Sequence, residues 1–234
     1  LTQGPVVEKY EQTFANYVGS KYAVSVSSCS AGLHVSALAL GLTKFDKFVT
    51  SPITFVSTVS AGLHLGSEPI FCDIDSKTIN ISIEKLEEIL KKNKKKIKLV
   101  IPVHFAGLPC DMKKIKNLSS RYGFKILEDA AHALGSKYDD GKKVGSCKYS
   151  DICVFSTHPV KTIATAEGGM ITTNNKSLYK RLLRLRSHGI NKNNGIFEDK
   201  TQAYSKGRRN LWYYEMSELG FHYRLNDIQS ALGI

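Results

Sequence analysis

The sequence contains no apolar run long enough to cross a bilayer, and its first residues, LTQGPVVEKY, do not resemble a signal peptide. It has no C-x-x-C pair, and its five cysteines are an odd number spread along the chain. This argues against a disulfide framework and against a zinc or other metal site, and it favours reduced thiols in a cytoplasmic protein. Internal repeats are absent as well, and the one low-complexity tract is a lysine run at 91–98.

Positive charge is in excess, with 33 Lys and Arg against 21 Asp and Glu and a net charge of +12. Such a balance raises nucleic acid as a partner. Much of the excess lies in KKNKKKIK at 91–98, where a helix predicted over 82–96 ends with lysines after Ser82 as its N-cap. No aromatic residues alternate with these lysines to stack on bases, so we interpret the run as a solvated helix end. A nucleic-acid binder stays an alternative that rests on net charge alone.

Short apolar strands alternate with helices along the chain. Helices are predicted at 5–18, 31–40, 55–65, 82–96, 111–122, 177–187 and 225–232, and strands at 22–26, 48–50, 69–73, 99–103, 124–129, 152–155 and 169–173. This alternation predicts an α/β fold with a mostly parallel sheet covered on both faces, where ligands bind at the carboxyl ends of the strands. Residues 188–210 are polar and aperiodic, as functional or disordered connections often are.

The stretch DICVFSTHPVKTIATAEGG at 151–169 places one lysine, Lys161, in a loop that follows a buried strand. A lysine held in a pocket loses solvation, and its neutral amine can attack a carbonyl to form a Schiff base. The plain alternative is a surface lysine beside a proline turn. His158 in the same loop is a candidate proton relay or substrate contact, or an ordinary buried histidine.

Two other strand ends carry polar residues. SSCSAG at 27–32 is a strand-to-helix turn whose amides suit a phosphate, although serines also cap helices without binding anything. LEDAAHALG at 127–135 ends a strand with Glu128 and Asp129, and His132 follows; the alternative is an Asp that caps a helix starting at Ala130. A phosphate turn, a buried carboxylate and an amine at three strand ends suit pyridoxal 5′-phosphate (PLP).

Seven ordered motifs resemble the DegT/DnrJ/EryC1/StrS sugar aminotransferases, a family of PLP enzymes with the aspartate aminotransferase fold (type I). They are SSCSAGLHVSALALG, SPITFVSTVSAG, IPVHFAG, EDAAHALGS, FSTHPVKTIATAEGGMITTN, LRSHGI and ELGFHYRLNDIQSALG. The resemblance implies a three-layer α/β/α domain with a mixed, mostly parallel central sheet. It also implies that residues 1–234 are the PLP-binding large domain. The family's N-terminal helical segment and its small C-terminal domain have no counterpart in this sequence, which begins with Leu and is expected to be processed or an excerpt.

Roles for individual residues follow from the same resemblance. Lys161 is expected to form the Schiff base with PLP and then to shuttle the proton, and Asp129 to pair with the pyridine nitrogen. His132 is expected near the phenolic oxygen of PLP, and Phe55 to stack on its ring. The residues expected to hold the phosphate are Ser30, Ala31 and Ser156 from one subunit and His222, or else Arg224 or Asn226, from the other subunit of a homodimer.

Within the family, FSTHPVK, LRSHGI and WYYEMSELGFHYRLNDIQSALG look most like the transaminases of pseudaminic acid biosynthesis. That likeness implies transfer of an amino group from L-glutamate to C4 of a UDP-linked 4-keto-6-deoxy sugar. An aminotransferase for another keto sugar, such as UDP-4-keto-arabinose, is the enzymatic alternative, and a non-catalytic regulator or scaffold is the alternative from another class. Some relatives carry histidine in place of this lysine and act as dehydratases, and the presence of Lys161 argues against that activity here.

Overall fold

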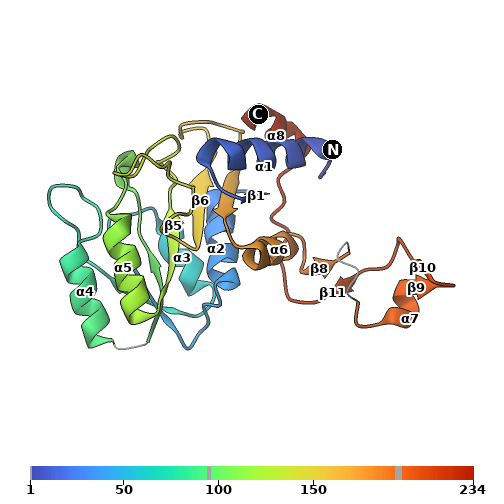
Figure 1. Cartoon of the computed structure of the whole chain (residues 1–234), viewed down its shortest axis with the longest axis horizontal. Helices are drawn as coiled ribbons and strands as arrows, with labels where there is room; N and C mark the ends of the chain where they lie inside the picture. The colour runs from blue at the N-terminus through green and yellow to red at the C-terminus, as the bar shows by residue number, and fades with distance from the viewer. Residues whose placement is uncertain (1, 94–95, 193–196) are drawn as a thin grey trace.

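A seven-stranded sheet forms the centre of the computed structural model, which describes residues 2–93, 96–192 and 197–234 (Figure 1). Its strands are β1 (Tyr22–Val26), β2 (Lys47–Thr50), β3 (Glu68–Phe71), β4 (Ile97–Ile101), β5 (Lys125–Asp129), β6 (Ile152–Ser156) and β7 (Gly169–Thr173). Their order in space is β1-β7-β6-β5-β4-β2-β3. Strand β7 is antiparallel to both of its neighbours and the other pairs are parallel, so the predicted mixed, mostly parallel sheet is confirmed.

Helices cover both faces of the sheet. One face carries α1 (Pro5–Val18), α4 (Ile83–Lys92) and α5 (Met112–Tyr122), and the other carries α2 (Cys29–Ala39), α3 (Val56–Leu63) and α6 (Lys176–Leu185). Strand residues alternate between the two cores, as Ile126 and Leu127 do in β5. The predicted three-layer α/β/α fold is confirmed. Among the described residues, none of the helices combines the length and apolarity needed to cross a bilayer.

Helix boundaries follow local capping. Gly19 ends α1 in the left-handed conformation, and Ser82 caps α4, both as predicted. Helix α2 begins two residues earlier than predicted because Ser28 is its N-cap and accepts the N–H of Ala31. The alternative of a helix starting at Ala130 is wrong, because Ala130 N–H donates to Val154 O and the residues after it form turns.

The segment after α6 extends away from the sheet (Figure 1). Its described elements are β8 (Ile190–Asn191), α7 (Lys200–Ala203), β9 (Tyr204–Ser205), β10 (Arg208–Arg209) and β11 (Glu215–Met216). Glu218 fixes the end of this segment on α6 by accepting from Arg181 Nε at 2.9 Å and Arg184 Nε at 3.1 Å. The prediction of an aperiodic connection at 188–210 covers residues 193–196, which lie outside the described residues.

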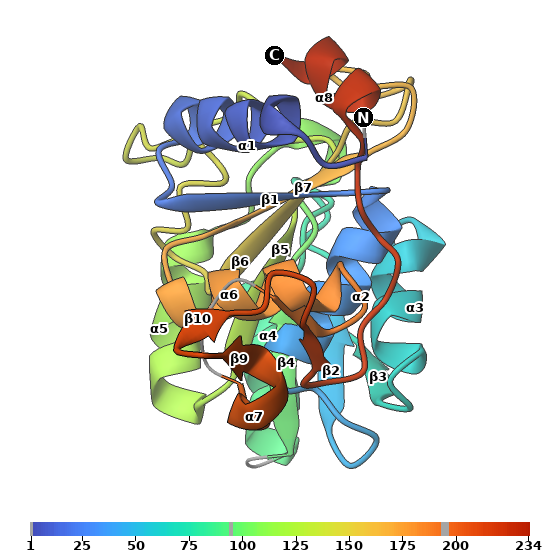
Figure 2. The ribbon, with the colours of Figure 1, turned by 90° about the vertical axis from the view of Figure 1, so that its right-hand side faces the viewer.

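The C-terminal helix α8 (Asp227–Gly233) returns to the domain and packs beside α1 (Figures 1 and 2). Its N-cap is Asn226, which accepts from Gln229 N–H at 2.9 Å. Asp227 in turn accepts from the N–H groups of Gly4 at 3.0 Å and Val7 at 3.1 Å at the start of α1. The ends of the described chain are therefore joined to each other by hydrogen bonds.

Candidate active site

A cavity of about 340 Å³ lies where β5 and β6 end and α2 and α3 begin. Seven of the residues predicted from sequence line it: Ser30, Phe55, Asp129, His132, Ser156, His158 and Lys161. They come from four separate stretches of the chain and meet because β5 and β6 are parallel and present their carboxyl ends at the same edge. The sheet topology thus gathers the predicted site residues in one place.

Lys161 is half-buried on the loop between β6 and β7, and its Nζ lies 2.7 Å from His132 Nε2. An ammonium group only donates, so Nε2 must accept and the ring proton sits on Nδ1. Burial, and after it the positive charge of Lys161, lower the pKa of His132, while Asp129 acts in the opposite direction. A neutral His132 is therefore the form that holds Lys161.

The loop that carries Lys161 is fixed across its base. Thr157 N–H donates to Gly168 O at 3.0 Å, and Thr165 N–H donates to Thr157 O at 2.9 Å. The two threonine hydroxyls lie 2.7 Å apart in a buried contact. These bonds join the two ends of the loop, so Lys161 has a defined position although it lies outside helices and strands.

Asp129 is the last residue of β5 and is 4% exposed. Its Oδ2 accepts from the hydroxyl of Thr58 at 2.6 Å, and its Oδ1 accepts from Ala131 N–H at 3.1 Å. Thr58 is a site residue that the sequence motifs did not predict. Thr54 precedes Phe55, the N-cap of α3, and its Oγ1 lies 2.7 Å from that of Thr58 in the first turn of the helix.

The turn from β1 into α2 forms another wall of the cavity. Ser28, Cys29 and Ser30 line it, and the N-terminus of a helix with its exposed N–H groups favours anions. Ala31 does not line the cavity, and its N–H is engaged by Ser28 Oγ at 3.1 Å. On the opposite strand Gly169 makes this turn possible, because a Cβ there would lie 2.7 Å from Cys29 N.

Glu128 does not belong to this cavity, because alternation along β5 points it to the opposite face. It is fully buried and accepts from His104 Nε2 at 2.8 Å, from the Tyr138 hydroxyl at 2.7 Å and from the Ser150 hydroxyl. Cys110 N–H donates to His104 Nδ1, so the imidazole proton is on Nε2 and donates to the carboxylate. Three donors therefore hold Glu128 as part of the core.

The three residues predicted to act across a subunit interface lie elsewhere in this chain. Arg224 Nη2 is 2.7 Å from His222 Nε2, and the His222 ring lies 5.2 Å from that of His188. Asn226 caps α8. None of the three lines the Lys161 cavity.

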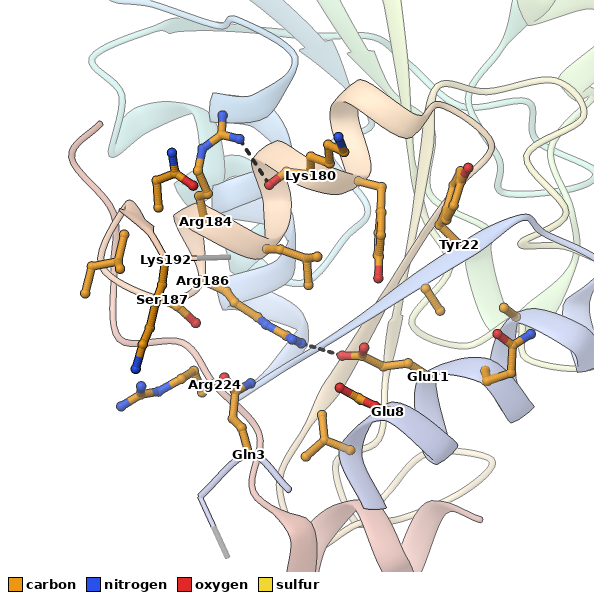
Figure 3. A pocket seen from close by; sticks show the side chains of 18 of the residues that line it. Gln3, Glu8, Glu11, Tyr22, Lys180, Arg184, Arg186, Ser187, Lys192 and Arg224 are labelled. Atoms are coloured by element: carbon orange, nitrogen blue, oxygen red, sulfur yellow. Dashed lines mark hydrogen bonds and ion pairs between the residues drawn. The ribbon is translucent and has the colours of Figure 1, made fainter. Parts of the chain in front are cut away.

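A second, larger cavity of about 810 Å³ lies between α1, α6 and the edge strand β1 (Figure 3). Figure 3 shows Arg186 and Glu11 pointing toward each other at its floor. Arg186 donates to Ser25 O at 2.7 Å, and Ser25 N–H donates to Glu11 at 2.9 Å. This ion pair satisfies backbone groups on an open sheet edge, which explains its place in the structure without a ligand.

Comparison with known proteins gives a consistent result. A family model described as the DegT/DnrJ/EryC1/StrS aminotransferase family matches residues 1–234. A relative from Campylobacter jejuni named UDP-4-amino-4,6-dideoxy-N-acetyl-beta-L-altrosamine transaminase is 41% identical over 234 residues, which are all of this chain and 57% of that protein.

Two solved structures are similar throughout. Helicobacter pylori PseC, described as an aminotransferase of pseudaminic acid biosynthesis, has a TM-score of 0.84 at 30% identity and covers 100% of this chain and 57% of its own. The PLP form of a putative sugar aminotransferase from Streptococcus pneumoniae has a TM-score of 0.82 at 26% identity, with coverage of 100% and 59%. The chain thus spans a little over half the length of the proteins it matches.

Proposed function

Because the chain belongs to the DegT/DnrJ/EryC1/StrS aminotransferase family, we propose that it takes part in a PLP-dependent transfer of an amino group to a nucleotide-linked keto sugar. The donor is L-glutamate and the acceptor is C4 of a UDP-linked 4-keto-6-deoxy sugar. One observation carries the proposal: an amine, a buried carboxylate and a helix N-terminus line the same cavity, through Lys161, Asp129 and Ser30.

The residues fit PLP in kind and in number. The turn at Ser28–Ser30 offers hydroxyls and a helix N-terminus to a phosphate, and Gly169 keeps the space beside that turn free of a side chain. Asp129 supplies the negative charge that a protonated pyridine nitrogen requires, and the exposed ring of Phe55 is available for stacking. PLP, when bound, supplies an aldehyde that carries the amino group and a ring that withdraws electrons from the reacting carbon.

Proton movement is assigned to Lys161 and His132. Their contact of 2.7 Å lets His132 accept a proton from Nζ or orient it by hydrogen bonding. A neutral imidazole suits this task, and burial keeps His132 in that form. We assign His158, whose Nε2 lies 3.8 Å from Glu167 at the edge of the cavity, to contact with the sugar or with the donor carboxylate.

The sugar itself is proposed from relatives. The Campylobacter jejuni protein is named for an N-acetyl-altrosamine substrate and PseC for pseudaminic acid biosynthesis, which favours a UDP-linked 4-keto-6-deoxy-N-acetylhexosamine. We place the reaction in the cytoplasm, where nucleotide sugars are expected, and the five buried free cysteines agree with a reducing compartment.

We further propose a homodimer in which each site is completed by the other subunit. Large apolar side chains are exposed beside the cavity, at Phe55 with 73% and Val160 with 76% exposure. Others are exposed on the extended segment, at Leu211 with 77% and Trp212 with 66%. Exposed apolar groups of this size favour a protein partner, and His222 and Arg224, which follow this segment in the sequence, are the candidate phosphate contacts.

The absorption spectrum of the purified protein tests the function. With PLP bound, addition of L-glutamate should convert the visible band to that of pyridoxamine phosphate, and a UDP-linked 4-keto-6-deoxy sugar should restore it. If UDP-4-keto-arabinose restores the band instead, the proposed substrate is wrong but the proposed reaction, transamination of a nucleotide-linked keto sugar, stands. A PLP band that does not respond to any amino donor would favour the non-catalytic scaffold.

A further inference from the structure

The hydroxyl of Thr58 lies 2.6 Å from Asp129 Oδ2, and Thr58 is fully buried. A charged carboxylate only accepts, so the single proton of Thr58 is donated to Asp129. Thr54 Oγ1 lies 2.7 Å from Thr58 Oγ1. Because the proton of Thr58 is already used, Thr54 is the donor in that contact. The two hydroxyls therefore form a hydrogen-bond relay from Thr54 through Thr58 to the carboxylate of Asp129.

This relay of hydroxyls fixes the orientation of the Asp129 carboxylate. Oδ2 is held by Thr58 and Oδ1 by the N–H of Ala131 at 3.1 Å, so the group cannot rotate without breaking one of the two bonds. Hydrogen bonds to charged acceptors are stronger than those between neutral groups. Thr58 also belongs to the turn that presents Phe55, because its N–H donates to Phe55 O at 3.1 Å. One turn of α3 therefore supports two walls of the cavity.

We propose that Thr58 is a positioning residue, which holds the Asp129 carboxylate in the orientation that PLP requires, and that Thr54 supports it. The inference rests on the proposed function, since Asp129 matters in this way only if PLP binds in the Lys161 cavity. Thr58 itself acts through Asp129.

The test compares Thr58→Val, which keeps the shape and removes the donor, with Thr58→Ser, which keeps the donor. Ser60→Ala is the matched control, because Ser60 is on the same helix and its hydroxyl only bonds back to Val56 O at 3.0 Å. PLP is titrated into each apo-protein, and the dissociation constant and the pH dependence of the bound-PLP absorption are recorded. Loss of one bond to a charged group should weaken binding about tenfold or more in Thr58→Val and shift its pH profile.

Thr58→Ser and Ser60→Ala should both retain the wild-type constant and profile. If Thr58→Val does not fold, Thr54→Val should show a smaller change in the same direction. A Thr58→Val protein that binds PLP with the wild-type constant and profile overturns the inference. So does a Thr58→Ser protein as impaired as Thr58→Val, because packing of the methyl group would then be the cause. Wild-type protein that binds no PLP overturns the proposed function as well.

Discussion

Replacement of Gly169 by alanine should distort the phosphate turn at Ser28–Ser30, although Gly169 lies on β7 and not in the turn itself. An alanine Cβ would lie 2.7 Å from Cys29 N, 2.7 Å from Ser28 C and 2.8 Å from Ser28 O, well inside the 3.4 Å at which ordinary contact begins. All three are backbone atoms, so no side chain can turn aside and the turn itself must move. Overpacking of this kind costs about 1–3 kcal/mol.

If most of that strain falls on the turn that binds phosphate, PLP affinity should decrease by about 5- to 150-fold. The control is Gly123→Ala, at the left-handed end of α5, where a Cβ meets nothing within 4 Å and the conformational strain costs about 1–2 kcal/mol. Both variants should melt at lower temperature, but only Gly169→Ala should bind PLP more weakly. Wild-type affinity in Gly169→Ala would refute the assignment of this turn to the phosphate.

Two further predictions concern the cavity. Asp129→Asn should retain PLP but slow transamination severely, because an amide cannot balance a protonated pyridine nitrogen; near-normal turnover with PLP shown to be present would contradict this role. By NMR, His132 should titrate below its ordinary value of 6.5, because burial and Lys161 both disfavour the imidazolium. In Lys161→Ala the midpoint should rise but stay below that value, since burial is the larger cause, and an unmoved midpoint would exclude the Lys161–His132 contact.

Much of the fold follows from local sequence. Continuous apolar stretches mark the strands, and capping residues such as Ser82 and Gly19 mark helix ends where they occur. The sequence predicts a start of α2 two residues too late, because each of the three serines in SSCSAG is a candidate N-cap and only the structure shows that Ser28 is the cap. The turn after Asp129 was ambiguous, since an aspartate before alanines also starts helices; pairing of Ala130 with Val154 decides it.

The candidate site was predictable where a residue type is unusual in its setting. A lysine and an aspartate at apolar strand ends stand out, so Lys161 and Asp129 were found. Thr58 was not, because threonine at a helix start is common and its contact with Asp129 joins residues 71 positions apart. The proposed role of His222 requires a second copy of the chain, and the sequence indicates it only through the family resemblance.

Identification of the lysine that binds PLP tests the central claim most directly. Borohydride reduction of the PLP-loaded protein followed by peptide mapping should place the pyridoxyl group on Lys161. Lys161→Ala should lose the label while keeping the fold, because among the described residues the side chain of this half-buried lysine hydrogen-bonds only to His132. Labelling of a different lysine in the wild-type protein would contradict the account.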